Sequence, residues 1–462
     1  MTTEWCDLPI ARLATAIEGR HVTPRALVDT LLARIEARAG LNAYVTVLAD
    51  RARAEADAAG AEIAAGRYRG PLHGVPVSVK DLIDVAGVPT TAASAATDRT
   101  PAADDAPVAA RLRAAGAILV GKCNLHEFAF GTTGEDSVFG PTRHPLDHAR
   151  SPGGSSSGSA VSVAAGLACA SLGTDTGGSV RIPAAACGLV GLKPTFGEIS
   201  CDGVVPLAPS LDHPGPLTRT VADARLLYHV LRDTTPDPSP GDPSTRRLGC
   251  LRPYFFDLLD DGIRRAVDTA LARLTAAGWR VEEAPVAHAA DTATVCLHLV
   301  LAEAAAVHAD GLERRGDAYT PGVRLRLELG RYVQAEDYVR ATRGREVLAE
   351  AVDAALAGRD ALALPSLAIP APRLGLEQVR VGGTAVSLRN IMLRLTQLFN
   401  ATGHPAISIP CGTTPDGLPA GLQLVGRRGE TDRLLDVAEA CETALGAWRS
   451  VPATAYRPTP WR

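Results

Sequence analysis

Serines lie in two glycine-rich segments of this chain, where a nucleophilic hydroxyl could be held. The first segment reads GSSSG over residues 154–158, and the second contains Ser179, 24 residues after Ser155. A serine attacks an amide carbonyl effectively only when a base takes its proton and the resulting oxyanion is stabilised. Local sequence places none of the eleven histidines beside Ser179, and no H-E-x-x-H motif is present. A Gly- and Ser-rich turn taken alone is more often structural; if one of these serines is a nucleophile, the sequence offers no neighbouring histidine and no such metal site to activate it.

Two shorter motifs suggest other functions, but the residues in and around them argue against both. Residues 154–158 fit the G-x-S-x-G nucleophile elbow, which would make Ser156 the nucleophile. The elbow needs a buried strand immediately before it, whereas residues 145–152 (PLDHARSP) form a polar loop bounded by prolines. Residues 116–123 (GAILVGKC) resemble a P-loop, but Cys123 replaces the Ser or Thr that binds magnesium, and AILV is typical of a strand.

Hydrophobic periodicity predicts the elements around these segments. Residues 74–79 alternate with β-branched side chains, which predicts a strand that ends at Lys80. A lysine at a strand end often lies on the surface; if it is carried inward here, Val77 and Val79 are expected to form apolar walls around it. Helix signals at 51–65, 108–115, 261–277 and 323–356 alternate with strand signals at 117–120, 361–364 and 406–409. This alternation is typical of an α/β fold.

Seven segments, taken together, resemble the amidase signature family. In chain order they are 74–81 (GVPVSVKD), 121–128 (GKCNLHEF), 152–160 (PGGSSSGSA), 173–184 (GTDTGGSVRIPA), 188–195 (GLVGLKPT), 210–216 (SLDHPGP) and 403–410 (GHPAISIP). The resemblance covers nearly the whole chain. It implies an α/β fold in which residues 1–462 form a single large domain, with a central mixed β-sheet covered by helices on both faces. The signature core spans about 70–220, and a Pro- and Asp-rich connection at about 234–246 is expected to be exposed.

The same resemblance implies a Ser–Ser–Lys catalytic triad. Ser179 is the implied nucleophile, Ser155 follows a cis peptide bond and passes the proton on, and Lys80 is the terminal base. The implied oxyanion hole consists of the backbone N–H groups of Thr176, Gly177, Gly178 and Ser179. A lysine acts as a base only when it is neutral, and lowering its pKa from about 10.4 to near 7 requires burial.

Three further residues near the implied triad are assigned supporting or neutral roles. Asp175 and Arg181 are expected to brace the loop that holds the nucleophile rather than to touch substrate. Ser157 stands where members of the family usually have glycine. We expect this difference to be neutral for catalysis.

The implied reaction is hydrolysis of a carboxamide to a carboxylate and ammonia or an amine through an acyl-enzyme, without a metal or other cofactor. Leu393 stands where the glutamine-hydrolysing subunit of the tRNA-dependent amidotransferase has an acidic residue, which favours a stand-alone amidase. The alternative is an ammonia-supplying or acyl-transferring subunit that needs a partner protein. Expected substrate contacts are Phe128, Gly131, Thr132, Arg324 and Arg345. Arg324, Arg326 and Arg345 are candidates for binding a carboxylate of the substrate. The alternative for each is an ordinary arginine on a helix face.

Composition limits the remaining alternatives. Hydrophobic residues make up 46% of the 462 residues and charged residues 21%, as in soluble globular proteins. A net charge of −4 gives no electrostatic reason to expect nucleic acid. Nine scattered cysteines without a C-x-x-C pair favour reduced thiols and a cytoplasmic location. We expect no signal peptide and no membrane span, because the first residues include an early acid and no apolar run of about 18 residues is evident. The expected partner is a small amide, and a homodimer is left open.

Overall fold

The computed structural model describes residues 5–234 and 246–446 of the chain. Its strands are β1 (Tyr44–Val47), β2 (Pro76–Lys80), β3 (Ile118–Cys123), β4 (Ala170–Thr174), β5 (Val190–Lys193), β6 (Pro214–Thr218), β7 (Arg247–Cys250), β8 (Arg280–Glu283), β9 (Ala361–Pro365), β10 (Gln378–Val381), β11 (Thr384–Ser387), β12 (Ala406–Thr413) and β13 (Pro419–Val425). The connection predicted at about 234–246 lies outside the described residues, except for its two end residues.

The α-helices of the described residues lie mostly between these strands along the chain, with two before β1 and one after β13. They are α2 (Ile10–Glu18), α3 (Pro24–Ala37), α4 (Ala49–Ala64), α5 (Pro107–Ala114), α6 (Ser157–Ala164), α7 (Arg181–Cys187), α8 (Val221–Arg232), α9 (Asp261–Ala276), α10 (Thr292–Val307), α11 (Ala309–Arg315), α12 (Pro321–Gly330), α13 (Ala335–Leu356), α14 (Leu388–Leu393), α15 (Gln397–Ala401) and α16 (Thr431–Leu445). Helix starts follow local signals: Thr23 caps α3 and Asp260 caps α9, each accepting a hydrogen bond from a backbone N–H group of the first turn.

Eleven strands form one sheet in the order β1-β3-β2-β4-β6-β5-β12-β13-β9-β7-β8. Strand β2 pairs in parallel with β3 and β4, and β7 pairs in parallel with β8 and β9. The other pairings in this sheet are antiparallel. The predicted α/β fold with a central mixed sheet is therefore confirmed.

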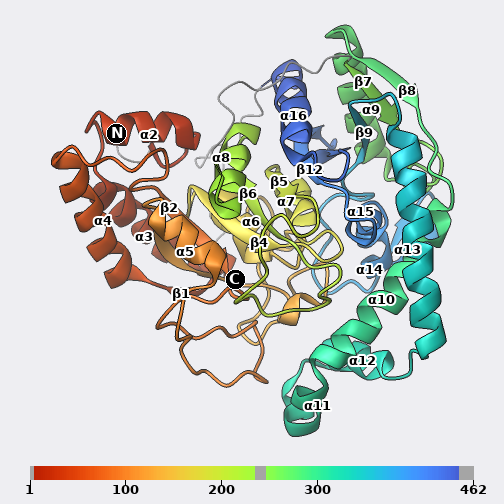
Figure 1. Ribbon diagram of the computed structural model, residues 1–462, viewed down its shortest axis with the longest axis horizontal. Helices are drawn as coiled ribbons and strands as arrows, with labels where there is room; N and C mark the ends of the chain where they lie inside the picture. Colours follow the sequence, from red (N-terminus) through yellow and green to blue (C-terminus); the bar gives the residue numbers. More distant parts are fainter. Residues whose placement is uncertain (1–4, 235–245, 447–462) are drawn as a thin grey trace.

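Helices cover both faces of the sheet, as predicted. On one face α5, α8, α16 and α9 pack against one another in a row and against the strands, whereas α6 and α7 pack together on the opposite face. Figure 1 shows α2, α3 and α4 at one end of the long axis and α10, α12 and α13 at the other. The main hydrophobic core joins the first helical row to the buried side chains of the strands.

The helical region predicted over 323–356 is two helices rather than one. Helix α12 ends at Gly330 and α13 begins at Ala335. A Cβ atom on Gly330 would lie 2.0 Å from the backbone oxygen of Leu301 in α10. The break is therefore set by close contact between two helices, which the periodicity of α12 and α13 does not reveal.

Helix α10 and the turn before it are unusually apolar. Ala289–Val307 reaches a mean hydropathy of 1.4 and is long enough to span a bilayer by length and composition alone. The prediction that no segment meets this criterion is therefore wrong. In the structure α10 packs against α12, α13 and α15, and several of its residues line the cavity described below. Only 33% of the apolar window is buried, so these contacts account for part of its apolar character and Leu297 and Val307 remain exposed.

Candidate active site

Strand β2 delivers Lys80 to the face of the sheet that α6 covers. Successive side chains of a strand point to opposite faces, so Ser78 and Lys80 share one face and Val77 and Val79 share the other. The hydroxyl of Ser78 lies 2.9 Å from that of Ser162 in α6, and both valines belong to the main core. The expectation that Val77 and Val79 wall the Lys80 amine is wrong, because alternation turns them away from it.

The Lys80 amine is fully buried among hydroxyl groups. Its Nζ lies 2.8 Å from Ser155 Oγ and 2.7 Å from Thr174 Oγ1, and the side chain has no exposed surface. Burial lowers the pKa of Lys80 from 10.5 to about 7, although the negative charges of Asp175 and Asp212 oppose this shift. A neutral amine next to a serine hydroxyl is therefore accessible near neutral pH.

Lys80, Lys122 and Lys193 are the only lysines in the chain, and all three are fully buried. Their partners differ. Lys122 forms a 2.9 Å ion pair with Asp81, and Lys193 lies 2.9 Å from the Pro194 oxygen and 3.2 Å from His213 Nε2. Of the three, Lys80 is the one whose amine contacts a serine of the glycine-rich segments, so geometry as well as burial separates it from the others.

The serines at 155, 156 and 157 have different surroundings. The Gly154–Ser155 peptide bond is cis. Ser156 Oγ is bonded to both the backbone oxygen and the N–H group of Thr174, and the Ser157 hydroxyl lies 3.1 Å from that of Thr142. Ser156 is thus committed to the β4 backbone, which argues against the nucleophile-elbow interpretation.

Ser179 lies just before α7 at the wall of a cavity of about 450 Å³. Its side chain is 4% exposed. The backbone N–H of Ser156 donates to the Ser179 oxygen over 3.3 Å, which ties the two glycine-rich segments together. The cavity also takes in parts of α10, α14 and α15 and the loop at 129–132. Its volume suits a small to medium ligand.

Three of the four predicted oxyanion donors have no hydrogen-bond acceptor within the described part of the chain: the N–H groups of Thr176, Gly177 and Ser179. The fourth, that of Gly178, donates to Asp175 Oδ1 over 2.8 Å. Gly178 has a φ of +135°, and a Cβ atom there would lie 2.2 Å from Thr396 Oγ1. Glycine is thus required for packing against Thr396, and the Gly178 N–H supports the loop rather than facing the cavity as a free donor.

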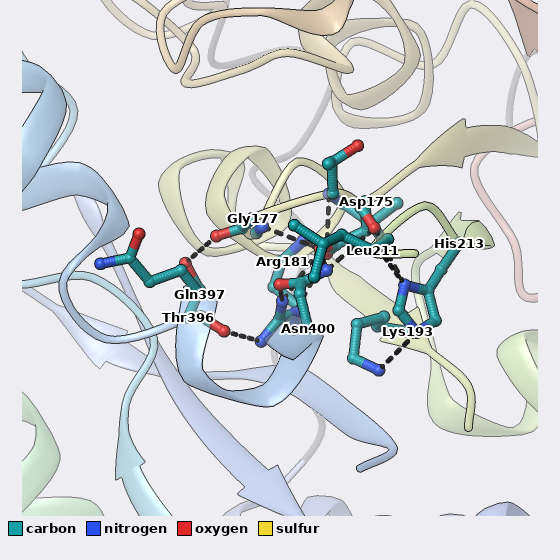
Figure 2. Close-up of polar contacts among 12 residues, drawn as sticks. Asp175, Gly177, Arg181, Lys193, Leu211, His213, Thr396, Gln397 and Asn400 are labelled. Atoms are coloured by element: carbon teal, nitrogen blue, oxygen red, sulfur yellow. Dashed lines mark hydrogen bonds and ion pairs between the residues drawn. The ribbon is translucent and has the colours of Figure 1, made fainter. Parts of the chain in front are cut away.

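A buried polar network holds the loop at residues 175–179 in place (Figure 2). The Arg181 guanidinium donates to both carboxylate oxygens of Asp175, at 3.0 and 2.9 Å, and to Asn400 Oδ1 at 2.6 Å. Thr396 donates its hydroxyl hydrogen to the Gly177 oxygen at 2.6 Å. Burial alone would raise the pKa of Asp175, but the charge and hydrogen bonds of Arg181 outweigh it and hold the pKa well below its usual range. The expected bracing role of Asp175 and Arg181 agrees with these contacts.

Replacing Asp175 with alanine should lower the free energy of unfolding by about 3–5 kcal/mol, because it leaves a buried guanidinium without its counter-ion. Urea denaturation followed by circular dichroism measures this change. The matched control is Asp317→Ala, which breaks an ion pair of Arg324 on the surface and should leave stability nearly unchanged. Equal effects of the two substitutions would contradict the bracing role.

The structure separates the predicted substrate contacts into two groups. Gly131 and Thr132 line the cavity together with Ser179. The Phe128 ring instead packs against His308 and Tyr319, at centroid distances of 4.5 and 5.2 Å. The aromatic residues at the cavity wall are Phe130 and Tyr254.

The two predicted arginines also lie away from this cavity. Arg324 is paired with Asp317 and Glu328 on the surface of α12. Arg345 lines a different cavity, beside Phe196 and Arg428. The prediction of Phe128, Arg324 and Arg345 as substrate contacts is therefore not supported, because helical and loop spacing does not tell which neighbouring side chain faces the cavity.

Several residues of the site were missed at the level of sequence. Thr174, the second partner of Lys80, lies within a segment used for the family resemblance, but its role depends on the pairing of β2 with β4. Arg389 and Arg394 line the cavity, and no local motif marks them. Within the described residues, no group of three or more His, Cys, Asp or Glu side chains is arranged to hold a metal ion.

A mixed sheet that presents a buried lysine and serines beside a cavity defines a class of α/β hydrolases. The family model described as amidase matches residues 26–435. An amidase of Pseudomonas putida is 42% identical over 455 residues, covering 95% of this chain and 96% of its own length. A glutamyl-tRNA(Gln) amidotransferase subunit of Koribacter versatilis (strain Ellin345) is 35% identical over 479 residues, covering 95% of this chain and 99% of its own length.

Comparison of structures gives the same result. A crystal structure of an amidase superposes with a TM-score of 0.91 at 38% identity, covering 95% of this chain and all of the other. The chain belongs to the amidase signature family, whose members are hydrolases that act on C–N bonds.

Proposed function

We propose that this protein is a stand-alone amidase that hydrolyses a carboxamide to a carboxylate and ammonia or an amine. The observation that carries the proposal is the 2.8 Å contact between the buried Lys80 amine and the Ser155 hydroxyl, beside the cavity that Ser179 lines. A lysine whose pKa is near 7 is a competent base at neutral pH.

In the proposed first step, Ser179 Oγ forms a bond to the carbonyl carbon of the amide. Its proton passes to Ser155 Oγ, and the Ser155 proton passes to Lys80 Nζ. The N–H groups of Thr176, Gly177 and Ser179 are the proposed donors to the oxyanion, and each such donor typically contributes about 2.7–4 kcal/mol. The intermediate then collapses, the C–N bond breaks, and the leaving nitrogen takes the proton back from Lys80 through Ser155.

Water completes the proposed cycle. It attacks the acyl–Ser179 ester and gives one proton to the same relay; the bond between the acyl carbon and Ser179 Oγ then breaks and Ser179 takes that proton back. The carboxylic acid that forms loses its proton to solvent and leaves as the carboxylate. The Thr174 hydroxyl, 2.7 Å from Lys80 Nζ, is proposed to fix the amine so that its lone pair faces Ser155. The relay requires no metal and no cofactor.

The isolated chain should release ammonia from primary amides without any partner protein. A coupled glutamate dehydrogenase assay over a panel of aliphatic, aryl and ureido amides measures this release, and mass spectrometry of the quenched enzyme detects the acyl adduct. The alternative, a component of an amidotransferase, is supported by the relative from Koribacter versatilis. Activity that appears only after addition of a second protein would favour that alternative.

The apolar side chain of Leu393 in the cavity wall supports the stand-alone enzyme, because it offers no charge to the ammonium group of free glutamine. Cytoplasmic location, absence of nucleic-acid and membrane partners, and a homodimer remain predictions. Light scattering of the purified protein measures the last of these.

A further inference from the structure

Two arginines lie near the ring of Phe130, a residue that lines the cavity. The guanidinium carbon of Arg326 lies 5.2 Å from the ring centroid, and that of Arg389 lies 5.7 Å from it. Arg389 follows the β10–β11 hairpin and lies in the first turn of α14, whereas Arg326 comes from the middle of α12. Two segments far apart in the sequence therefore bring positive charge to the Phe130 ring: Arg389 lines the cavity together with Phe130, and Arg326 lies on the ring without lining the cavity.

These charges are poorly neutralised. No ion pair or hydrogen bond of Arg389 occurs within the described residues, and its Nε is buried without a partner. Arg326 forms one ion pair within the described residues, with Asp136 at 3.9 Å, and Asp136 lies closer to His126, at 3.2 Å. The negative charge of Glu127 also acts on Arg326, although the two form no ion pair. Arg324, two residues before Arg326 on α12, contrasts with both because two carboxylates bind it.

The charged side chains that line the cavity all carry positive charge. Its described lining contains two charged side chains, Arg389 and Arg394, and no Asp or Glu. Arg394 is held by Tyr254: its guanidinium lies 3.8 Å from the ring centroid and donates to the backbone oxygen at 2.7 Å. Arg389 has only a longer ring contact, 5.7 Å from the Phe130 centroid, and no side-chain hydrogen bond within the described residues. The remaining wall is largely apolar, with Leu207, Leu258 and Val300 among its members.

Burial lowers the pKa of Arg389 to about 10, and the nearby charge of Arg326 contributes to the shift. The side chain therefore remains protonated at neutral pH. An unpaired cation in a site of low polarity is costly, and a bound anion relieves that cost. Guanidinium groups bind carboxylates in a planar, two-point geometry.

We infer that Arg389, supported by Arg326, binds a carboxylate of the substrate, so that the enzyme acts on amides that also carry a carboxylate, such as half-amides of dicarboxylic acids. This inference rests on the proposed amidase function. The anion would sit beside Phe130 while the amide carbonyl reaches Ser179 at the same cavity. A cationic substrate would be rejected, because Arg389 and Arg394 would repel it without a compensating acid.

The test compares half-amides with neutral diamides of equal chain length, from malonamate to adipamate and from malonamide to adipamide. The wild-type enzyme should give a kcat/KM at least about tenfold higher for its best half-amide than for the matching diamide. Arg389→Met should lower kcat/KM for that half-amide by about 10- to 150-fold, mainly through KM, the range expected for a hydrogen bond to a charged group. Its kcat/KM for the diamide should change less than about threefold.

Arg324→Met is the matched control, because it removes the same charge from the surface of α12, and it should leave both substrates unaffected. Arg389→Lys should restore part of the preference. Equal loss on half-amide and diamide in Arg389→Met, or no preference in the wild type, would overturn the inference. A stronger preference for a phosphonate-bearing amide would overturn the choice of carboxylate.

A neutral alkyl fluorophosphonate separates this inference from the proposed function. Arg389→Met should be labelled at Ser179 at the wild-type rate, which shows that the variant is folded and its nucleophile intact. Labelling with hydrolysis of diamides but no preference for half-amides would refute the carboxylate site and leave the amidase proposal standing. Absence of labelling in the wild type would count against the amidase proposal itself.

Discussion

Replacement of Ser179 by alanine should reduce kcat for amide hydrolysis by about 10⁴- to 10⁶-fold, the range seen when the nucleophile of a serine hydrolase is removed. The reason is that Ser179 is the group that forms the acyl-enzyme in the proposed mechanism. The same variant should not react with a fluorophosphonate. Initial rates with the best amide of the panel, and intact-protein mass spectrometry after labelling, measure both effects.

Ser156→Ala is the control for this substitution. It makes the same chemical change in the neighbouring segment, where the Ser156 hydroxyl is bonded to the Thr174 backbone, and it should still be labelled. A labelled Ser179→Ala protein together with an unlabelled Ser156→Ala protein would show that the G-x-S-x-G interpretation is right after all and that Ser179 is not the nucleophile.

Replacement of Lys80 by methionine should lower kcat/KM by about 10²- to 10⁴-fold, the usual contribution of a general base. In the wild-type enzyme, kcat/KM should rise about tenfold per pH unit below the pKa of Lys80, which burial sets at about 7, and level off above it. The rise follows the neutral fraction of the amine. A profile that is flat between pH 5.5 and 8 would exclude Lys80 as the base.

The Lys80→Met substitution should affect stability and activity in opposite directions. In the unfolded chain Lys80 recovers a pKa near 10.5, so between about 7 and 10.5 the unfolded state binds more protons than the folded state. Wild-type stability should therefore rise with pH in this window, and Lys80→Met should lack that rise. At pH 7 the variant should be at least as stable as the wild type in urea, because burying the amine costs about 4 kcal/mol before its hydrogen bonds are counted.

The small number of lysines makes the titration directly measurable. A protein labelled with ¹³C at the lysine ε-carbon should give three resonances, one for each lysine of the chain. The resonance that is missing from Lys80→Met identifies Lys80, and its chemical shift should titrate near pH 7. Titration above pH 9 would contradict the proposed base.

Much of the fold was predictable because local signals and long-range packing agree. Helix α9 is predicted at 261–277 and occurs at Asp261–Ala276, since its capping residue Asp260 and its apolar stripe both belong to the local sequence. The break between α12 and α13 is not predicted, because it depends on the approach of Gly330 to the backbone of α10. A tertiary contact of this kind leaves no periodic signal.

The residues of the candidate site also fall into those that the sequence could predict and those that it could not. Lys80, Ser155 and Ser179 lie in segments whose residue types and order are distinctive, so the family resemblance that these segments carry predicts their roles. Phe130 and Arg389 have no such pattern: one lies two residues from the aromatic residue that was expected at the cavity, and the other matters because no acid lies near it. The absence of a partner is a property of the folded chain, so spacing could not predict it.

The burial of all three lysines also makes amine chemistry a monitor of conformation. Positive charge on the surface of the described protein is carried by arginine, so a reagent selective for amines finds no ε-amino group on the folded molecule. Three such groups become reactive when the chain unfolds. The rate at which an amine-reactive dye modifies them should therefore report the opening of the structure, and coupling through lysine to a solid support should capture unfolded rather than native enzyme.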